Sequence, residues 1–126
     1  MLDTEGSKPI YIQISEWIEN EILKGRFRVD EKVYSQYKLA DIFTINPATA
    51  AKGLNVLANE HILYDKRGLG KFVAHDAVEV IKDKRKNQTL KGLMKDIVSE
   101  ASYLGLDQET VLSLLKETYD EMEEDQ

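Results

Sequence analysis

The chain has 126 residues, 17 Lys and Arg against 23 Asp and Glu, a formal net charge of −6, and no cysteine. This composition excludes a disulfide-stapled scaffold and thiolate metal sites, and no apolar run is long enough for a transmembrane helix. The beginning of the chain lacks the basic and apolar regions of a signal peptide, so we expect a cytoplasmic protein. The length predicts one domain, or a small domain with an appendage.

Residues near the ends of the first two predicted helices mark where each helix begins or ends. Pro9 suits the first position of a helix and Gly25 suits its end. Between them isoleucine recurs at every fourth residue, at positions 10, 14, 18 and 22, which predicts an amphipathic helix. The short segment 27–33 is predicted as one small strand. Ser35 can cap a second short helix, whose inward residues would be Leu39, Ala40, Ile42 and Phe43.

A third helix follows after a short turn. Asn46 is a good N-cap and Pro47 a good first helical residue. Two short helices joined by such a turn form a helix-turn-helix. The third helix has a narrow face predicted to be buried, made of Ala50, Gly53, Leu54 and Leu57, and an opposite face made of Ala48, Thr49, Lys52 and Asn55.

The hydrophobic period changes to two after Asn59. Two short alternating segments flank the glycine-containing and basic loop 66–71, which predicts a β-hairpin. A hairpin that directly follows a helix-turn-helix makes a winged helix. The predicted fold is therefore mainly α with a small β-hairpin, a winged helix-turn-helix domain followed by a two-helix tail. We place the winged helix-turn-helix domain in residues 1–75 and the helical tail region in residues 76–126.

The tail is predicted to hold two amphipathic helices. The first ends at Gly105, and Asp107 caps the second, whose inward residues would be Val111, Leu112, Leu114, Leu115, Tyr119 and Met122. Two helices that face only each other leave part of such a stripe uncovered, so the tail is predicted to pair two subunits. Packing onto the chain's own winged domain is the alternative. The predicted dimerisation residues are Leu90, Leu93, Met94, Ile97, Val98, Leu112, Leu115 and Tyr119.

The charge is divided between these two parts of the chain. Residues 1–75 carry ten basic and ten acidic groups, whereas residues 76–126 carry seven basic and thirteen acidic groups. No acidic residue occurs between Ile42 and Asn59. The third helix can therefore approach a polyanion, while the acidic tail should face a partner subunit or solvent. The charged run 82–86 could touch flanking phosphates or serve as a solvated connector.

Four motifs occur in order within residues 9–74. They are Pro9-Ile10-Tyr11-Ile12-Gln13-Ile14, Ser35-x-x-x-Leu39-Ala40, Asn46-Pro47-x-Thr49-x-x-Lys52 and Lys66-Arg67-Gly68-x-Gly70-x-Phe72-Val73. These motifs resemble the GntR superfamily of bacterial transcription regulators, and the short helical tail resembles its YtrA type. The chain departs from the family in two places. Val33-Tyr34-Ser35 stands where the family usually has Leu-Pro-Ser, and Tyr37 stands where the family usually has a DNA-contacting arginine.

The resemblance implies a sequence-specific transcription regulator, a repressor in most relatives of this type, that binds a palindromic operator in double-stranded DNA as a homodimer. Several of the candidate contacts have a structural alternative. Asn46 and Thr49 could serve only as caps, Lys52 could be a solvated lysine, Tyr37 could pack half-buried, and the wing could be an ordinary turn. The candidate DNA-binding residues are Ser35, Tyr37, Lys38, Asn46, Ala48, Thr49, Lys52, Asn55, Lys66, Arg67, Gly68, Gly70 and Lys71.

Other classes of function are less well supported by the residues. A winged-helix module for protein–protein association, without specific DNA binding, is the second candidate. An enzyme is not expected, because Gly70-Lys71 lacks the rest of a phosphate-binding loop and His61 and His75 are the chain's two histidines. We expect no metal site, no cofactor and no membrane contact. A small-molecule effector is left open, although the tail is short for enclosing a pocket.

Overall fold

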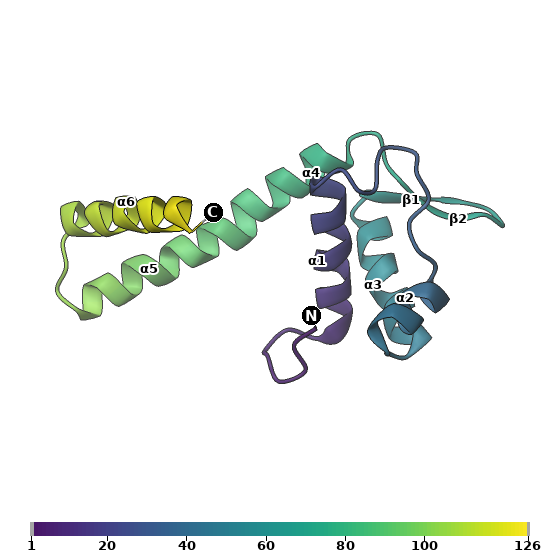
Figure 1. Ribbon diagram of the computed structural model, residues 1–126, viewed down its shortest axis with the longest axis horizontal. Coiled ribbons are helices and arrows are strands. Elements are labelled where there is room, and N and C mark those ends of the chain that lie inside the picture. Colours follow the sequence, from purple (N-terminus) through teal and green to yellow (C-terminus); the bar gives the residue numbers. More distant parts are fainter. Residues whose placement is uncertain (1, 126) are drawn as a thin grey trace. The chain divides into compact units, whose positions relative to one another are not determined.

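The chain forms two compact units, divided between Asp83 and Lys84. Figure 1 shows the computed structural model, which describes residues 2–125. Among the described residues, the first unit holds three helices, one two-stranded antiparallel sheet and nearly all of a fourth helix, and the second unit holds further helices. The mainly helical fold with a small hairpin is thereby confirmed.

Helix α1 (Ile10–Leu23) supplies the centre of the first unit's core. Ile14, Ile18 and Ile22 are buried, as the four-residue spacing predicts, and burying each of them is worth about 1.5–3 kcal/mol. The helix ends before Gly25, whose φ of 78° is left-handed. Sequence patterning did not reveal that Glu21 is buried on the same helix. Arg26 Nη1 donates to both carboxylate oxygens of Glu21, at 2.9 and 3.1 Å.

An aromatic cluster closes one side of this core. The indole ring of Trp17 lies 5.1 Å from the ring of Phe43 and 6.4 Å from that of Phe27, both edge-on. Tyr34 stacks on Trp17 at 6.3 Å. Tyr34 stands where the family that the chain resembles usually has proline, and its ring packs against those of Trp17 and Phe27.

Helices α2 (Gln36–Phe43) and α3 (Pro47–Asn59) form the predicted helix-turn-helix. Ser35 Oγ accepts a hydrogen bond from the Lys38 N–H at 3.1 Å, and Asn46 Oδ1 accepts one from the Ala48 N–H at 2.8 Å. Both predicted caps are confirmed. The inward orientation predicted for Ile42 is wrong, since 37% of this residue is exposed. The buried stripe of this two-turn helix is narrow, and Leu39 and Phe43 already fill it.

Helices α1 and α3 approach one another closely at Gly53. Ser15 Oγ is buried and donates to the carbonyl oxygen of Gly53, at 2.8 Å. A Cβ atom added to Gly53 would lie 2.8 Å from the carbonyl oxygen of Tyr11 and 3.0 Å from Ile14 Cγ2. The glycine is therefore needed because backbone, not a movable side chain, occupies the space.

The hairpin consists of β1 (Leu63–Lys66) and β2 (Gly70–Val73), paired so that Leu63 faces Val73 and Tyr64 faces Phe72. The strand predicted over residues 27–33 is wrong, because only Lys32 forms an isolated bridge, to Phe72. The positive φ of Asp30, 66°, interrupts the extended backbone there. The segment still braces β2, since the Val33 N–H donates to the Lys71 carbonyl at 3.0 Å.

Helix α4 (Ala77–Lys84) belongs with the first unit because Ala77 and Ile81 are fully buried in its core. The two units consequently divide later than residue 75, where the sequence interpretation placed the boundary. The residues after α4 form a short π-helix, η1 (Arg85–Leu90). The charged run 82–86 is therefore continued by an irregular helical turn.

The second unit contains α5 (Lys91–Tyr103) and α6 (Gln108–Glu124). Gly105, with φ of 68°, ends the first of these helices as predicted. Asp107 Oδ1 accepts from the Thr110 N–H at 2.9 Å, and hydrogen bonds from the side chain and then the backbone of Thr110 hold the pKa of Asp107 below its ordinary value. The cap therefore stabilises α6 at neutral pH and weakens as the pH falls through that lowered pKa.

Most apolar side chains of α6 are exposed within residues 2–125, contrary to the inward orientation predicted for them. Leu112 is 55% exposed and Tyr119 is 64% exposed, and Leu114 and Met122 are also exposed, although Val111 and Leu115 are partly covered. The stripe of α5 is open in the same way, apart from the buried Ala101. The helical spacing identified an apolar face correctly, but that face remains largely exposed among the described residues.

Helix length and hydropathy also bear on membranes. Within residues 2–125, the structure has no helix that combines the length and the apolar character needed to span a bilayer.

The close approach at Gly53 predicts an unusual effect of alanine. Gly53→Ala should destabilise the protein by about 1–3 kcal/mol, because the new methyl group overlaps the Tyr11 carbonyl, although alanine favours a helix by about 1 kcal/mol over glycine. Gly92→Ala in α5 is the matched control, since a Cβ there would meet nothing within 4 Å, and it should be neutral or stabilising. Urea unfolding followed by circular dichroism, at one protein concentration, measures both. Equal stabilisation by the two substitutions would contradict the overlap.

Candidate nucleic-acid interface

The N-terminal part of α3 presents compact and polar side chains to solvent. Ala48, Lys52 and Asn55 are exposed, and Thr49 is partly covered. Asn46 Oδ1 is used by the cap, which leaves the amide NH2 as the part of that side chain able to donate to a phosphate. No acidic residue lies between positions 42 and 59. The N-terminus of α3, which is the positive end of the helix dipole, therefore has no carboxylate in its own segment of the sequence to repel an anion.

Lys52 has a defined position on this surface. Its Nζ atom lies 4.1 Å from the centroid of the Tyr11 ring, so the ammonium group sits over an aromatic face contributed by α1. Such a cation–π contact restrains a lysine without cancelling its charge. Sequence reasoning singled out Lys52 but not Tyr11, because the two are far apart in the chain.

The start of α2 carries the next group of candidates. Ser35 serves as the N-cap, while Tyr37 and Lys38 point outward. The half-buried packing considered for Tyr37 is wrong, since 70% of the residue is exposed. Tyr37 can donate one hydrogen bond to a phosphate, although it lacks the bidentate fork of the arginine found there in the family.

The turn of the hairpin, which projects from the first unit (Figure 1), supplies the basic loop. Gly68 and Gly70 have φ of 78° and 117°, and the Leu69 N–H closes the turn on the Lys66 carbonyl at 2.9 Å. Arg67 is exposed at this turn. Lys66 Nζ lies 4.4 Å from the centroid of the Phe72 ring. The glycines are thus required by the backbone, and the cations surround the tight turn that they permit.

The third basic residue of the hairpin is paired differently. Lys71 Nζ lies 2.6 Å from Asp65 Oδ1, in an ion pair across the two strands. A carboxylate that already holds this ammonium competes with any phosphate for it. The wing consequently offers Lys66 and Arg67 more readily than Lys71.

Lys32 is a basic residue of this region that sequence reasoning missed. Its backbone pairs with Phe72, and its side chain runs across Gly70, where an added Cβ would lie 2.9 Å from Lys32 Cε. Lys32 is exposed and brings another cation beside Gly70, at the turn end of the wing. The only signal in the sequence was the short mixed segment around it, which did not reveal its pairing partner.

The wing is braced by a contact from the same segment. The Tyr64 hydroxyl donates to Asp30 Oδ1 at 2.7 Å, and this hydrogen bond to a carboxylate raises the pKa of Tyr64 above its ordinary value of 10.0. The contact therefore stabilises the hairpin at neutral pH and is lost only as the pH rises through that raised pKa.

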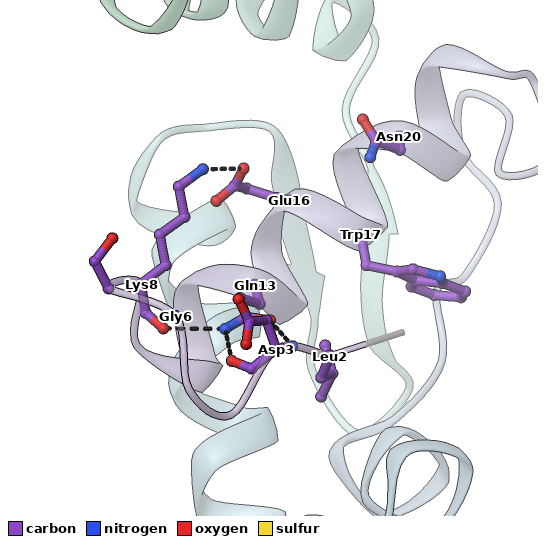
Figure 2. A pocket seen from close by; sticks show the side chains of 9 residues that line it. Leu2, Asp3, Gly6, Lys8, Gln13, Glu16, Trp17 and Asn20 are labelled. Atoms are coloured by element: carbon purple, nitrogen blue, oxygen red, sulfur yellow. Dashed lines mark hydrogen bonds and ion pairs between the residues drawn. The ribbon is translucent and has the colours of Figure 1, made fainter.

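A separate hollow of about 420 Å³ lies at the beginning of α1, between that helix and the preceding residues (Figure 2). Gln13 joins the two sides, because its Nε2 donates to the carbonyls of Asp3 and Lys8 at 2.6 and 3.0 Å. Lys8 reaches across to Glu16 at 3.0 Å. The hollow contains none of the candidate DNA-binding residues.

The described part of the chain offers no cluster of three or more His, Cys, Asp or Glu side chains able to hold a metal ion. His61 is exposed just after α3, with a φ of 63°, and His75 is exposed after β2.

A helix-turn-helix whose second helix has an exposed, carboxylate-free start, followed by a basic hairpin, defines the winged helix-turn-helix class of DNA-binding domains. The chain is 30% identical to the HTH-type transcriptional repressor YtrA of Bacillus subtilis over 116 residues, which cover 92% of this chain and 88% of that protein. No protein-family model matches the sequence.

Solved structures agree with this relationship. A GntR family transcriptional regulator from Listeria monocytogenes is 32% identical, with a TM-score of 0.75 over 92% of this chain and 98% of that one. The AraR DNA-binding domain in complex with operator ORX1 is 28% identical, with a TM-score of 0.54 over 59% of this chain and 93% of that one. The chain belongs to the GntR family of transcription regulators. Its match to YtrA along most of both chains confirms the YtrA type.

The ion pair in the wing predicts that removing a carboxylate strengthens DNA binding. Asp65→Asn should raise affinity for duplex DNA about two- to fivefold, because Lys71 is released for a phosphate. The slope of log affinity against log salt should become steeper by about 0.9. Asp120→Asn in α6 changes the net charge equally and is the control. Fluorescence anisotropy at two salt concentrations measures both, and identical behaviour of the two variants would contradict competition by Asp65.

Proposed function

We propose that the protein is a repressor that binds a palindromic operator in double-stranded DNA as a homodimer. The observation that carries this proposal is the start of α3, which exposes Ala48, Lys52 and Asn55 beside a helix N-terminus in a stretch without acidic residues. The names of similar proteins support the same conclusion, since YtrA of Bacillus subtilis is a transcriptional repressor and the AraR domain is bound to an operator. Binding to chromosomal DNA would place the protein in the cytoplasm.

Each exposed group on α3 has a task in the major groove. Ala48 is short enough for close approach, and its methyl group can contact a thymine methyl. Asn55 can read an adenine edge, while Lys52 can reach a guanine edge or a phosphate. Asn46 and Thr49 can donate to phosphates near the helix start. Base edges give sequence preference, and phosphates fix the register.

The other candidate residues would hold the domain on the backbone. Ser35, Tyr37 and Lys38 at the start of α2 are placed to meet phosphates beside the groove. In the wing, Lys66, Lys71 and the glycine turn can follow the backbone closely. Arg67 can enter a narrow minor groove, which attracts a guanidinium.

A single domain with so few cations would bind DNA weakly. Two joined domains on one duplex would bind more tightly, because their contacts add. The exposed apolar stripe of the tail provides a means of joining them. Its members are Leu90, Leu93, Met94, Ile97, Val98, Leu112 and Tyr119, all exposed in the described chain, with Leu115 partly covered beside them. Covering large apolar side chains is worth about 1.5–3 kcal/mol each. A two-fold dimer would present two α3 helices to half-sites about one helical turn apart.

Mobility shift with the DNA upstream of the protein's own gene tests the DNA-binding proposal. Lys52→Ala and Arg67→Ala should each weaken binding about three- to tenfold, and loss of a phosphate contact should reduce the salt slope by about 0.9. Lys116→Ala on α6 removes the same charge and should have no effect. If the unaltered protein gives no salt-dependent shift, the proposal fails and the winged-helix association module becomes the better explanation.

Light scattering tests the dimer. The protein should have twice its chain mass of 14.4 kDa at micromolar concentration. Leu112→Lys places a charge in the exposed stripe and should produce monomers that bind the operator weakly. Glu117→Lys introduces the same side chain on the polar side of α6 and should remain dimeric. A monomeric mass for the unaltered protein would rule the dimer out.

A further inference from the structure

We propose that Tyr11 is a positioning residue for DNA recognition, whose ring holds the Lys52 ammonium group in the direction in which it meets DNA. The proposal rests on the proposed function, because Lys52 must contact DNA for its position to matter. The carrying observation is the 4.1 Å distance between Lys52 Nζ and the centroid of the Tyr11 ring. Tyr11 lies in the first turn of α1, outside the helix-turn-helix and the wing.

The position of Tyr11 is fixed by the same contact that joins α1 to α3. Ser15 Oγ is within hydrogen-bond distance of the Tyr11 carbonyl, at 3.1 Å, and of the Gly53 carbonyl, at 2.8 Å. The absence of a side chain at Gly53 lets the Tyr11 backbone lie directly against α3. Lys52 is the residue next to Gly53. The backbone contact therefore places the ring of Tyr11 beneath the side chain of Lys52.

The start of α1 is held from its other side as well. Gln13 bonds through its amide to the backbone of Asp3 and Lys8, which precede the helix (Figure 2). Tyr11 is partly buried, whereas Lys52 is exposed. A rigid ring thus lies under a lysine that would otherwise sample many rotamers.

Holding Lys52 on a ring has a different effect from holding it on a carboxylate. The face of an aromatic ring attracts a cation but carries no net charge, so the ammonium group keeps its full charge for the DNA. A carboxylate, as at Lys71 and Asp65, would compete with phosphate. Because the side chain is ordered before binding, less rotamer freedom is lost when the contact with DNA forms.

A double-mutant cycle on operator binding tests this role. The variants are Tyr11→Leu, Tyr11→Phe, Lys52→Met and the double variant Tyr11→Leu with Lys52→Met. Tyr11→Leu should weaken binding about three- to fivefold, the size expected of an exposed cation–π contact. Tyr11→Phe keeps the ring and should stay within about twofold of the unaltered protein. In the Lys52→Met background, Tyr11→Leu should cause no further loss.

A second measurement reads the contact without DNA. In the NMR spectrum of the free protein, the ring current of Tyr11 should shift the Hε protons of Lys52 upfield relative to those of Lys38. The shift should persist in Tyr11→Phe and vanish in Tyr11→Leu. Urea unfolding of each variant shows whether the domain stays folded, and Tyr11→Met replaces Tyr11→Leu if that variant does not fold.

The outcomes separate the two proposals. If the unaltered protein binds the operator but Tyr11→Leu weakens binding equally with and without Lys52, Tyr11 acts independently and the positioning role is overturned. If Tyr11→Phe loses as much as Tyr11→Leu, the hydroxyl group contacts DNA instead, and the role is again overturned. If the unaltered protein shows no salt-dependent binding, the proposed function itself has failed.

Discussion

The contact between α1 and α3 at Gly53 is the constraint on which the candidate interface depends. A glycine in the middle of a helix costs about 1 kcal/mol relative to alanine, yet no larger residue fits against the Tyr11 carbonyl. The buried hydroxyl of Ser15 then donates to the carbonyl oxygen of Gly53, so this polar group has a partner inside the close approach. This packing point fixes how closely α3 approaches α1, and it brings Lys52, the residue next to Gly53, to the ring of Tyr11.

The basic residues of the first unit differ in what holds them. Lys8, Arg26 and Lys71 lie against carboxylates, at 2.6–3.0 Å, and part of their charge is cancelled locally. Lys52 and Lys66 lie over aromatic rings instead. A ring orders a lysine while leaving its charge available. A count of lysines and arginines along the sequence cannot distinguish these two situations, although they differ in what the cations can offer to a phosphate.

The features predicted well from the sequence were those encoded within a few residues. Ser35, Asn46 and Asp107 each cap a helix that begins directly after them, and Gly105 ends one. The features that were missed depend on contacts between distant segments. The cation–π contact of Lys52 with Tyr11 and the pairing of Lys32 with the hairpin cannot be predicted from neighbouring residues in the sequence. Ile42 and η1 show a second limit of sequence patterns. An apolar residue at helical spacing can still lie at the exposed edge of a helix, and a continuous helical run can contain a π-helical turn.

The tail shows what an apolar pattern does and does not specify. Apolar residues at helical spacing predict that one face of the helix is buried. They do not specify whether the same chain or another subunit buries that face. Figure 1 shows α6 running back beside α5, yet Leu112 and Tyr119 stay largely exposed. The excess of acidic residues lies in the same segment. Acidic groups on the winged domain would weaken its phosphate contacts, whereas on the tail they lie in a separate segment of the chain and keep its exposed apolar faces soluble.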